Sequence, residues 1–189
     1  MRLFVAVNFD NTVRDAIQAA LDDFPVANPP WRWLSSENWH VTLKFLGETQ
    51  EDDVADVVSA LEGVRTRHVV FHVALGKFGA FPSLRAARVL FYSVETGAEN
   101  LAALANDVDR ALEAAIGSQR ETRRFHAHAT VARIKEPLPR SVTDALASVP
   151  LLSHPVTRVS TFDLVESRLD RTGARYSVVK RFALPWGAC

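Results

Sequence analysis

The stretch HVTLKFLG, residues 40 to 47, alternates polar and apolar side chains and so predicts a β-strand with two different faces. Because residues two apart on a strand share a face, His40 and Thr42 are expected side by side, with Lys44 next along that face. The apolar positions are expected on the opposite face: Val41, Leu43 and Phe45. The stretch therefore predicts an imidazole and a hydroxyl presented together by one strand.

The same motif recurs in HATVARIK, residues 128 to 135, where His128 and Thr130 form a second pair. An apolar strand and an amphipathic helix precede each motif, with 37 positions from Leu3 to His40 and 38 from Leu90 to His128. This order predicts a duplicated strand–helix–strand unit with approximate two-fold symmetry.

The remaining segments predict further helices and strands. Apolar residues at helical spacing indicate helices after Asp10, after Gly47, after Thr96 and around Val142 to Val149. Runs of β-branched and aromatic residues indicate strands at 68–76 and 87–95 and a closing hairpin around DRTG, residues 170 to 173. No shift in composition marks a boundary, so we expect one domain over residues 1–189, made of two lobes interleaved in sequence.

Composition limits the classes of function. The chain has 22 basic and 22 acidic residues, so it lacks the overall positive charge typical of non-specific binders of long nucleic acid. Its only cysteine, Cys189, permits no intramolecular disulfide and favours a reducing compartment. The start MRLFVAVNFD does not have the pattern of a signal peptide, and no apolar run reaches membrane-spanning length. We expect a cytoplasmic protein without a membrane segment.

Two His-x-Thr strands facing one cleft would place two imidazoles on opposite sides of a reacting centre. One imidazole can take a proton from water while the other gives a proton to a departing oxygen, and histidine titrates near neutral pH without a large shift. One such motif is usually just a half-exposed strand face; the second copy favours catalysis. Zinc lacks a cysteine partner and a helical HExxH motif here, so we expect no metal and no cofactor.

Several motifs together resemble the 2H phosphoesterases, specifically the RNA 2',3'-cyclic phosphodiesterases (ThpR or LigT, also called 2'-5' RNA ligases): the paired HVTLKFLG and HATVARIK, the start RLFVAV, the segment ARVLFYSVE and the ending LVESRLDRTGARYSVVKRFAL. The resemblance implies a bilobal α+β fold with a cleft between two antiparallel sheets and the helices outside. It also implies hydrolysis of 2',3'-cyclic phosphates to 2'-phosphomonoesters and, in reverse, 2'-5' ligation. By position, His40 matches the proton donor, His128 the proton acceptor, and Thr42 and Thr130 the phosphate ligands.

Further substrate contacts are predicted around the two motifs. Residues 118 to 135 hold five basic residues against Glu121, a local excess of +4: Arg120, Arg123, Arg124, Arg133 and Lys135. Arg124 and Lys44 are candidates for phosphate or ribose contact. Arg133 reaches the phosphate only if its strand twists or bulges. Aromatic residues near the first motif could stack a base or, as most are expected to do, pack in the core: Trp31, Trp33, Trp39 and Phe45.

The expected ligands are RNA ends, oligonucleotides and nucleoside 2',3'-cyclic phosphates, bound by a monomer without an obligate protein partner. Two other functions remain open from the sequence. A related 2H enzyme could cleave 2'-5' linked oligonucleotides with the same residues and a different base pocket. A non-catalytic module could keep the cleft for nucleotide binding alone.

Overall fold

The computed structural model describes residues 1–149, 156–170 and 173–187 and has the expected α+β architecture. Within those ranges the helices are α1 (Asn11–Asp22), α2 (Val54–Arg65), α3 (Ala98–Ile116) and α4 (Arg140–Leu146), with short 3-10 turns at Ser36–Asn38 and Leu84–Ala86. The strands are β1 (Arg2–Asn8), β2 (His40–Glu48), β3 (Phe71–Phe81), β4 (Val89–Thr96), β5 (His128–Arg133), β6 (Val156–Val159), β7 (Thr161–Asp170) and β8 (Gly173–Ala183).

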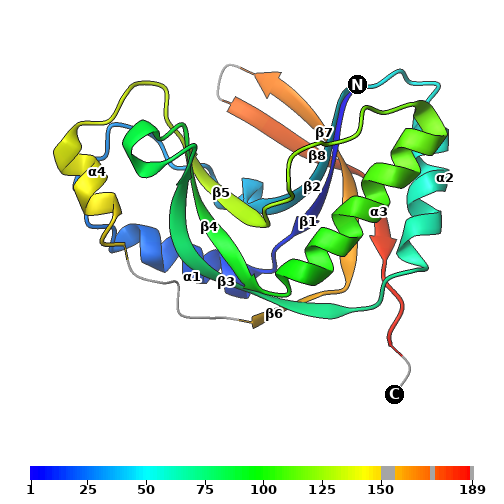
Figure 1. Ribbon diagram of the computed structural model, residues 1–189, viewed down its shortest axis with the longest axis horizontal. Helices are drawn as coiled ribbons and strands as arrows, with labels where there is room; N and C mark the ends of the chain where they lie inside the picture. Colours follow the sequence, from blue (N-terminus) through cyan, green and yellow to red (C-terminus); the bar gives the residue numbers. More distant parts are fainter. Residues whose placement is uncertain (150–155, 171–172, 188–189) are drawn as a thin grey trace.

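These strands form one antiparallel sheet in the order β6-β3-β4-β5-β2-β1-β7-β8. The two expected sheets are thus two four-stranded halves of a single curled sheet, joined where β5 pairs with β2 (Figure 1). Each half contains one copy of the repeat, since β1 pairs with β2 and β4 pairs with β5. The closing hairpin is present as the β7–β8 pair, and residues 171 and 172 of its predicted turn lie outside the described residues.

Two of the helices, α1 and α3, pack on the half of the sheet that they do not follow in sequence. Helix α3 follows β4, yet it packs with α2 against β2, while α2 contacts β8. Helix α1 follows β1, yet it contacts β6 and its C-terminal neighbour Phe24 packs on Phe78 of β3, with ring centroids 5.3 Å apart. Figure 1 shows α2 and α3 together on one flank and α1 and α4 on the other. Each half of the sheet is thus covered by a helix that follows a strand of the other half.

The helices bury apolar residues at helical spacing. Helix α1 is capped by Asp10, whose Oδ1 accepts the N–H of Val13 at 3.0 Å, and it buries Val13, Ile17 and Leu21. Every stripe residue predicted for α3 is buried: Leu101, Leu104, Ala105, Val108 and Leu112. Helix α4 ends at Leu146, before the predicted Val149. Within the described ranges, no helix is both long and apolar enough to cross a membrane.

The tryptophans near the first motif belong to the core, the use expected for most of them. Trp39 is fully buried. Trp31 and Trp33 pack against Phe24, with ring centroids 6.3 and 4.8 Å away. Trp31 and Trp33 are partly buried against the core cluster that contains Trp39, and none of the three lines the cleft described below.

Candidate functional site

The two His-x-Thr motifs meet at the centre of the sheet. The single residue pair recorded between β2 and β5 opposes Val41 and Ala129, which are the middle residues of the two motifs. Because the strands are antiparallel, this register sets His40 across from Thr130 and His128 across from Thr42. All four polar side chains are partly exposed, whereas Val41 and Ala129 are buried. The motifs thus present two imidazoles and two hydroxyls from one face.

Both imidazoles are oriented by the same backbone contact. The Nδ1 of His40 lies 2.7 Å from the carbonyl oxygen of Asn38, and the Nδ1 of His128 lies 2.6 Å from that of His126. A carbonyl oxygen can only accept, so Nδ1 must carry a proton in each ring. Nε2 is then the nitrogen that exchanges protons. In His40 it lies 3.0 Å from the hydroxyl of Thr42, which donates to it when the ring is neutral.

Aromatic rings pack on both histidines in a matching way. Phe4 of β1 lies 5.0 Å from the His40 ring, and Phe91 of β4 lies 5.2 Å from the His128 ring, measured between centroids. These phenylalanines occupy corresponding positions in the two repeats. Tyr176 and Phe81 add a second ring to each side, at 5.4 Å from His40 and 5.0 Å from His128. Each imidazole therefore has an apolar wall behind it.

This environment disfavours the charged form of both imidazoles. Burial lowers the pKa of His40 from 6.5 to about 4, helped by the nearby charges of His128 and Arg133 and opposed by the Asn38 carbonyl. Burial likewise lowers the pKa of His128, opposed by the His126 carbonyl and helped by His126 and Arg133. A bound anion would reverse both effects, because an opposite charge at close range favours the protonated ring.

A β-bulge follows each motif and changes which side chains face the cleft. On β5, Thr130 pairs with Phe91 and Ala132 with Leu90, so Val131 is an extra residue. The bulge moves Arg133 onto the face of His128 and Thr130, which is the condition under which the sequence allowed a phosphate contact. On β2, Leu43 is the corresponding extra residue.

The bulge in β2 makes two predictions from strict alternation wrong. Lys44 was expected beside His40 and Thr42, and it borders the cleft, but its side chain is 7% exposed and its ammonium lies 2.5 Å from Asp109 Oδ1. Phe45 was expected to point away from His40, but it is 65% exposed and lines the cleft. Phe45 thus stands five residues after His40, as Arg133 stands five residues after His128.

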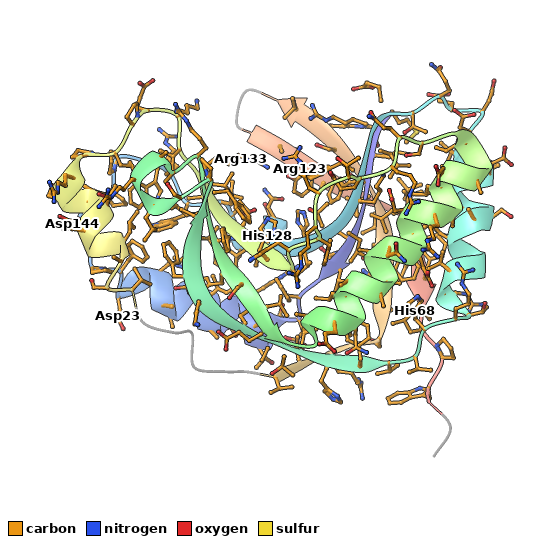
Figure 2. All side chains as sticks on the ribbon, viewed as in Figure 1. Asp23, His68, Arg123, His128, Arg133 and Asp144 are labelled. Atoms are coloured by element: carbon orange, nitrogen blue, oxygen red, sulfur yellow. The ribbon has the colours of Figure 1, made fainter. Side chains whose placement is uncertain are left out.

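The motifs lie at the base of a cleft of about 720 Å³. The loop between α3 and β5 forms part of its wall through Arg123, Arg124 and Phe125. Figure 2 shows Arg123, His128 and Arg133 in the region between the two helical flanks. Arg120, also in the predicted basic segment, turns to Asp109 and Glu113 at 3.5 Å each. The predicted contacts Arg124, Arg133, Phe45 and Lys44 thus all border the cleft, but the Lys44 ammonium is bound to Asp109 and to the carbonyl of Gln119.

Three further residues of the cleft have no signal in the sequence. Tyr176 of β8, Phe81 of β3 and Arg88 after the turn Leu84–Ala86 all line it. Tyr176 and Phe81 lie far along the chain from the histidines that they contact, so no local pattern reveals them. In the described part of the chain, no group of three or more His, Cys, Asp or Glu side chains is arranged to hold a metal ion.

A curled antiparallel sheet with two His-x-Thr motifs on its central strands defines the class of 2H phosphoesterases. The chain belongs to the family of LigT-like phosphoesterases, whose model matches residues 7–91 and 93–176.

Curated relatives and solved structures agree with this family. The chain is 32% identical over 182 residues to an RNA 2',3'-cyclic phosphodiesterase of Archaeoglobus fulgidus, covering 96% of this chain and 99% of the relative. It is 30% identical to that of Aquifex aeolicus over 81% of each chain. The crystal structure of a Thermus thermophilus protein superposes with a TM-score of 0.82 at 30% identity, covering all of both chains. Apo LigT of E. coli gives 0.77 at 26% identity, covering 97% of each.

Proposed function

We propose that the protein hydrolyses 2',3'-cyclic phosphates, on RNA ends or nucleosides, to 2'-phosphomonoesters. The pairing of Val41 with Ala129 carries the proposal, because it brings both motifs to one cleft. Two comparisons support the substrate class. Relatives at about 30% identity are RNA 2',3'-cyclic phosphodiesterases, and E. coli LigT, at 26% identity, has been solved with 3'-AMP and with phosphate.

Proton transfer in this proposal runs through the two Nε2 atoms. His128 Nε2 takes a proton from water as the water oxygen attacks phosphorus. The bond from phosphorus to the 3'-oxygen breaks, and His40 Nε2 donates its proton to that oxygen. The 2'-oxygen keeps the phosphate. The family resemblance decides which histidine is acid and which is base, since the two rings have equivalent backbone contacts.

The bound phosphate favours the protonated form of His40, which the proton donor requires. His40 has a pKa of about 4 before substrate binds, too low for a proton donor at neutral pH. The negative charge of the bound phosphodiester raises this pKa and so favours the protonated ring that the donor role requires. Thr42 and Thr130 hydrogen-bond the non-bridging oxygens, and Arg133 adds a positive charge on the same face. The same groups support 2'-5' ligation in reverse, with the roles of the histidines exchanged.

Hydrolysis of 2',3'-cyclic AMP in the presence of EDTA tests the proposal. We expect turnover to persist with the chelator and 2'-AMP to be the product seen by ³¹P NMR. His40→Ala and His128→Ala should each lower kcat by a factor of about 10² to 10⁴, the usual contribution of one proton transfer. Undiminished activity in either variant, loss of activity in EDTA, or a 3'-phosphate product would contradict the mechanism.

A further inference from the structure

From its position in the sequence, Lys44 is expected to contact the substrate in the cleft. In the structure it forms a buried ion pair instead. Its side chain is 7% exposed, and that of its partner Asp109, on α3, is 10% exposed. A buried charge is costly unless it is paired and its remaining donors and acceptors are satisfied. The bonds of this pair therefore indicate what it stabilises.

Those bonds converge on one loop. The Lys44 ammonium donates to the carbonyl oxygen of Gln119 at 2.5 Å, in addition to Asp109. Asp109 Oδ1 accepts the backbone N–H of Glu121 at 3.3 Å, and its Oδ2 accepts Arg120 Nε at 3.5 Å. Three successive residues after α3 are thus fastened to the pair.

The same loop then forms the cleft wall. Arg123 and Arg124 come after Thr122 and line the cleft. Glu121, which lies 3.6 Å from Arg123, offsets part of this charge, so residues 121 to 124 have a net charge of +1. The pair thus fastens the segment that leads to Arg123 and Arg124 to the strand of His40.

The other half of the molecule anchors its corresponding loop without charge. The chain before His40 is fastened to the bulge of β5 by the N–H of Leu34, which donates to the carbonyl of Val131 at 2.8 Å, and by a β-bridge between Trp33 and Ala132. Ala132 occupies the position in the second motif that Lys44 occupies in the first. Each loop before a histidine is therefore held at the bulge of the opposite motif, and the loop that bears Arg123 and Arg124 is the one held by an ion pair.

We propose that Lys44 and Asp109 are positioning residues for RNA: they hold Arg123 and Arg124 at the mouth of the cleft, where the arginines bind backbone phosphates beyond the terminal cyclic phosphate. This rests on the proposed function and extends it to substrates of several nucleotides. A cyclic mononucleotide has a single phosphate, which the motif residues hold. The pair therefore matters for oligonucleotides and not for cyclic mononucleotides.

Steady-state kinetics on two substrates test this role: 2',3'-cyclic AMP and an RNA oligonucleotide ending in a 2',3'-cyclic phosphate. Lys44→Met should raise KM for the oligonucleotide about tenfold, the size expected for one lost charge-assisted contact. We expect its kcat/KM for cyclic AMP to change less than about twofold, within the error of additivity. The double variant K44M/D109L, with apolar groups replacing both charges, should fold and show the same selective loss. Asp144→Asn, in a remote exposed ion pair (Figure 2), is the matched control.

A double-mutant cycle separates positioning from general destabilisation. In an R123A/R124A background, Lys44→Met should raise the oligonucleotide KM no further, because the side chains that it positions are gone. An equal loss on both substrates, a loss that persists in that background, or no loss in K44M and K44M/D109L would overturn the proposal.

A binding measurement keeps this proposal separate from the proposed function. If the native protein turns over neither substrate, the proposed function fails. Titration with an oligonucleotide ending in a 2'-phosphate and with 2'-AMP then decides the positioning role. We expect K44M/D109L to weaken binding of the oligonucleotide about tenfold and binding of 2'-AMP less than about twofold. An unchanged ratio of the two affinities would overturn the positioning role.

Discussion

His40 and His128 have equivalent backbone contacts and pack against corresponding phenylalanines. Any difference between their catalytic roles must therefore come from other residues around them. One pair of corresponding positions makes the cleft asymmetric. Five residues after His128 stands Arg133, whereas five residues after His40 stands Phe45, and both line the cleft. A phosphate between the motifs thus has a positive charge on one side and an apolar ring on the other. This asymmetry gives a nearly two-fold site a direction.

A substrate that needs no acid distinguishes the roles of the two histidines. A 4-nitrophenyl phosphodiester of a nucleotide has a leaving group that departs without protonation. His40→Gln should therefore lose much less activity on this substrate than the roughly 10² to 10⁴ expected on cyclic AMP, whereas His128→Gln should lose a similar factor on both. Release of nitrophenolate measures this. The reverse pattern would exchange the two assignments.

Phosphate binding should take up protons. In the free protein His40 has a pKa of about 4, and a bound phosphate raises this pKa. At a pH between about 4 and the raised pKa, binding therefore protonates the ring. Affinity for 2'-AMP should then fall as pH rises through the raised pKa. Calorimetric titration in buffers of different ionisation enthalpy measures the uptake, and His40→Gln is the control. The same uptake in that variant would show that the ligand or another group supplies the effect.

The same pKa also sets a direction for folding stability. Folding lowers the pKa of His40 from 6.5 to about 4, so between these values the unfolded chain binds more protons than the folded one. The stability that neutral His40 contributes is complete above about pH 6.5 and is lost as pH falls toward about 4.

At the level of elements, the strands and helices that carry the motifs could be predicted, because the spacing of apolar residues differs between a strand and a helix. Alternation located both motifs, and helical spacing located the buried stripe of α3. The bulges could not be predicted, since an extra residue is visible only through its partner strand. The extra residue Leu43 in β2 turned Phe45 to the cleft, and the extra residue Val131 in β5 brought Arg133 to it.

The bulge of β5 makes a prediction about Arg133. Because it faces the cleft beside Thr130, Arg133→Ala should lower kcat/KM on cyclic AMP by about 10- to 100-fold, the range for a lost hydrogen bond to a charged group. Arg133→Lys should recover part of this, as it keeps the charge without the planar fork. Arg140→Ala, an exposed surface substitution, is the control. Activity of Arg133→Ala equal to that control would place Arg133 outside the site.

For the whole molecule, the exchange of helices couples the two halves. Helix α3 leaves β4 and packs over β2, and α1 leaves β1 and packs by β3 and β6, so each half needs the other to cover it. We therefore propose that residues 1–189 form one cooperative domain, as expected from the sequence. The active cleft between the motifs then exists only when both halves are folded.

Unfolding should reflect this coupling. Tryptophan fluorescence, which reports Trp31, Trp33 and Trp39 together with the exposed Trp186, and far-ultraviolet circular dichroism should give one coincident transition in denaturant. Leu104→Ala, at a fully buried position of α3, should lower the free energy of unfolding measured by both signals by about 2 to 5 kcal/mol. Leu169→Ala, at a position that is 71% exposed, should leave it unchanged. Two separated transitions would show that the halves fold independently.

The most direct test of two-histidine catalysis is a crystal structure with 2'-AMP bound. Two histidines from two interleaved repeats are proposed to act on one phosphorus, a consequence of the pairing of Val41 with Ala129. We predict that His128 Nε2 lies about 2.6 to 3.2 Å from an oxygen of the 2'-phosphate and that His40 Nε2 lies at the same distance from the 3'-hydroxyl oxygen or a phosphate oxygen, with Thr42 and Thr130 bound to the phosphate. A nucleotide contacted by only one imidazole, or bound outside this cleft, would contradict the proposed mechanism.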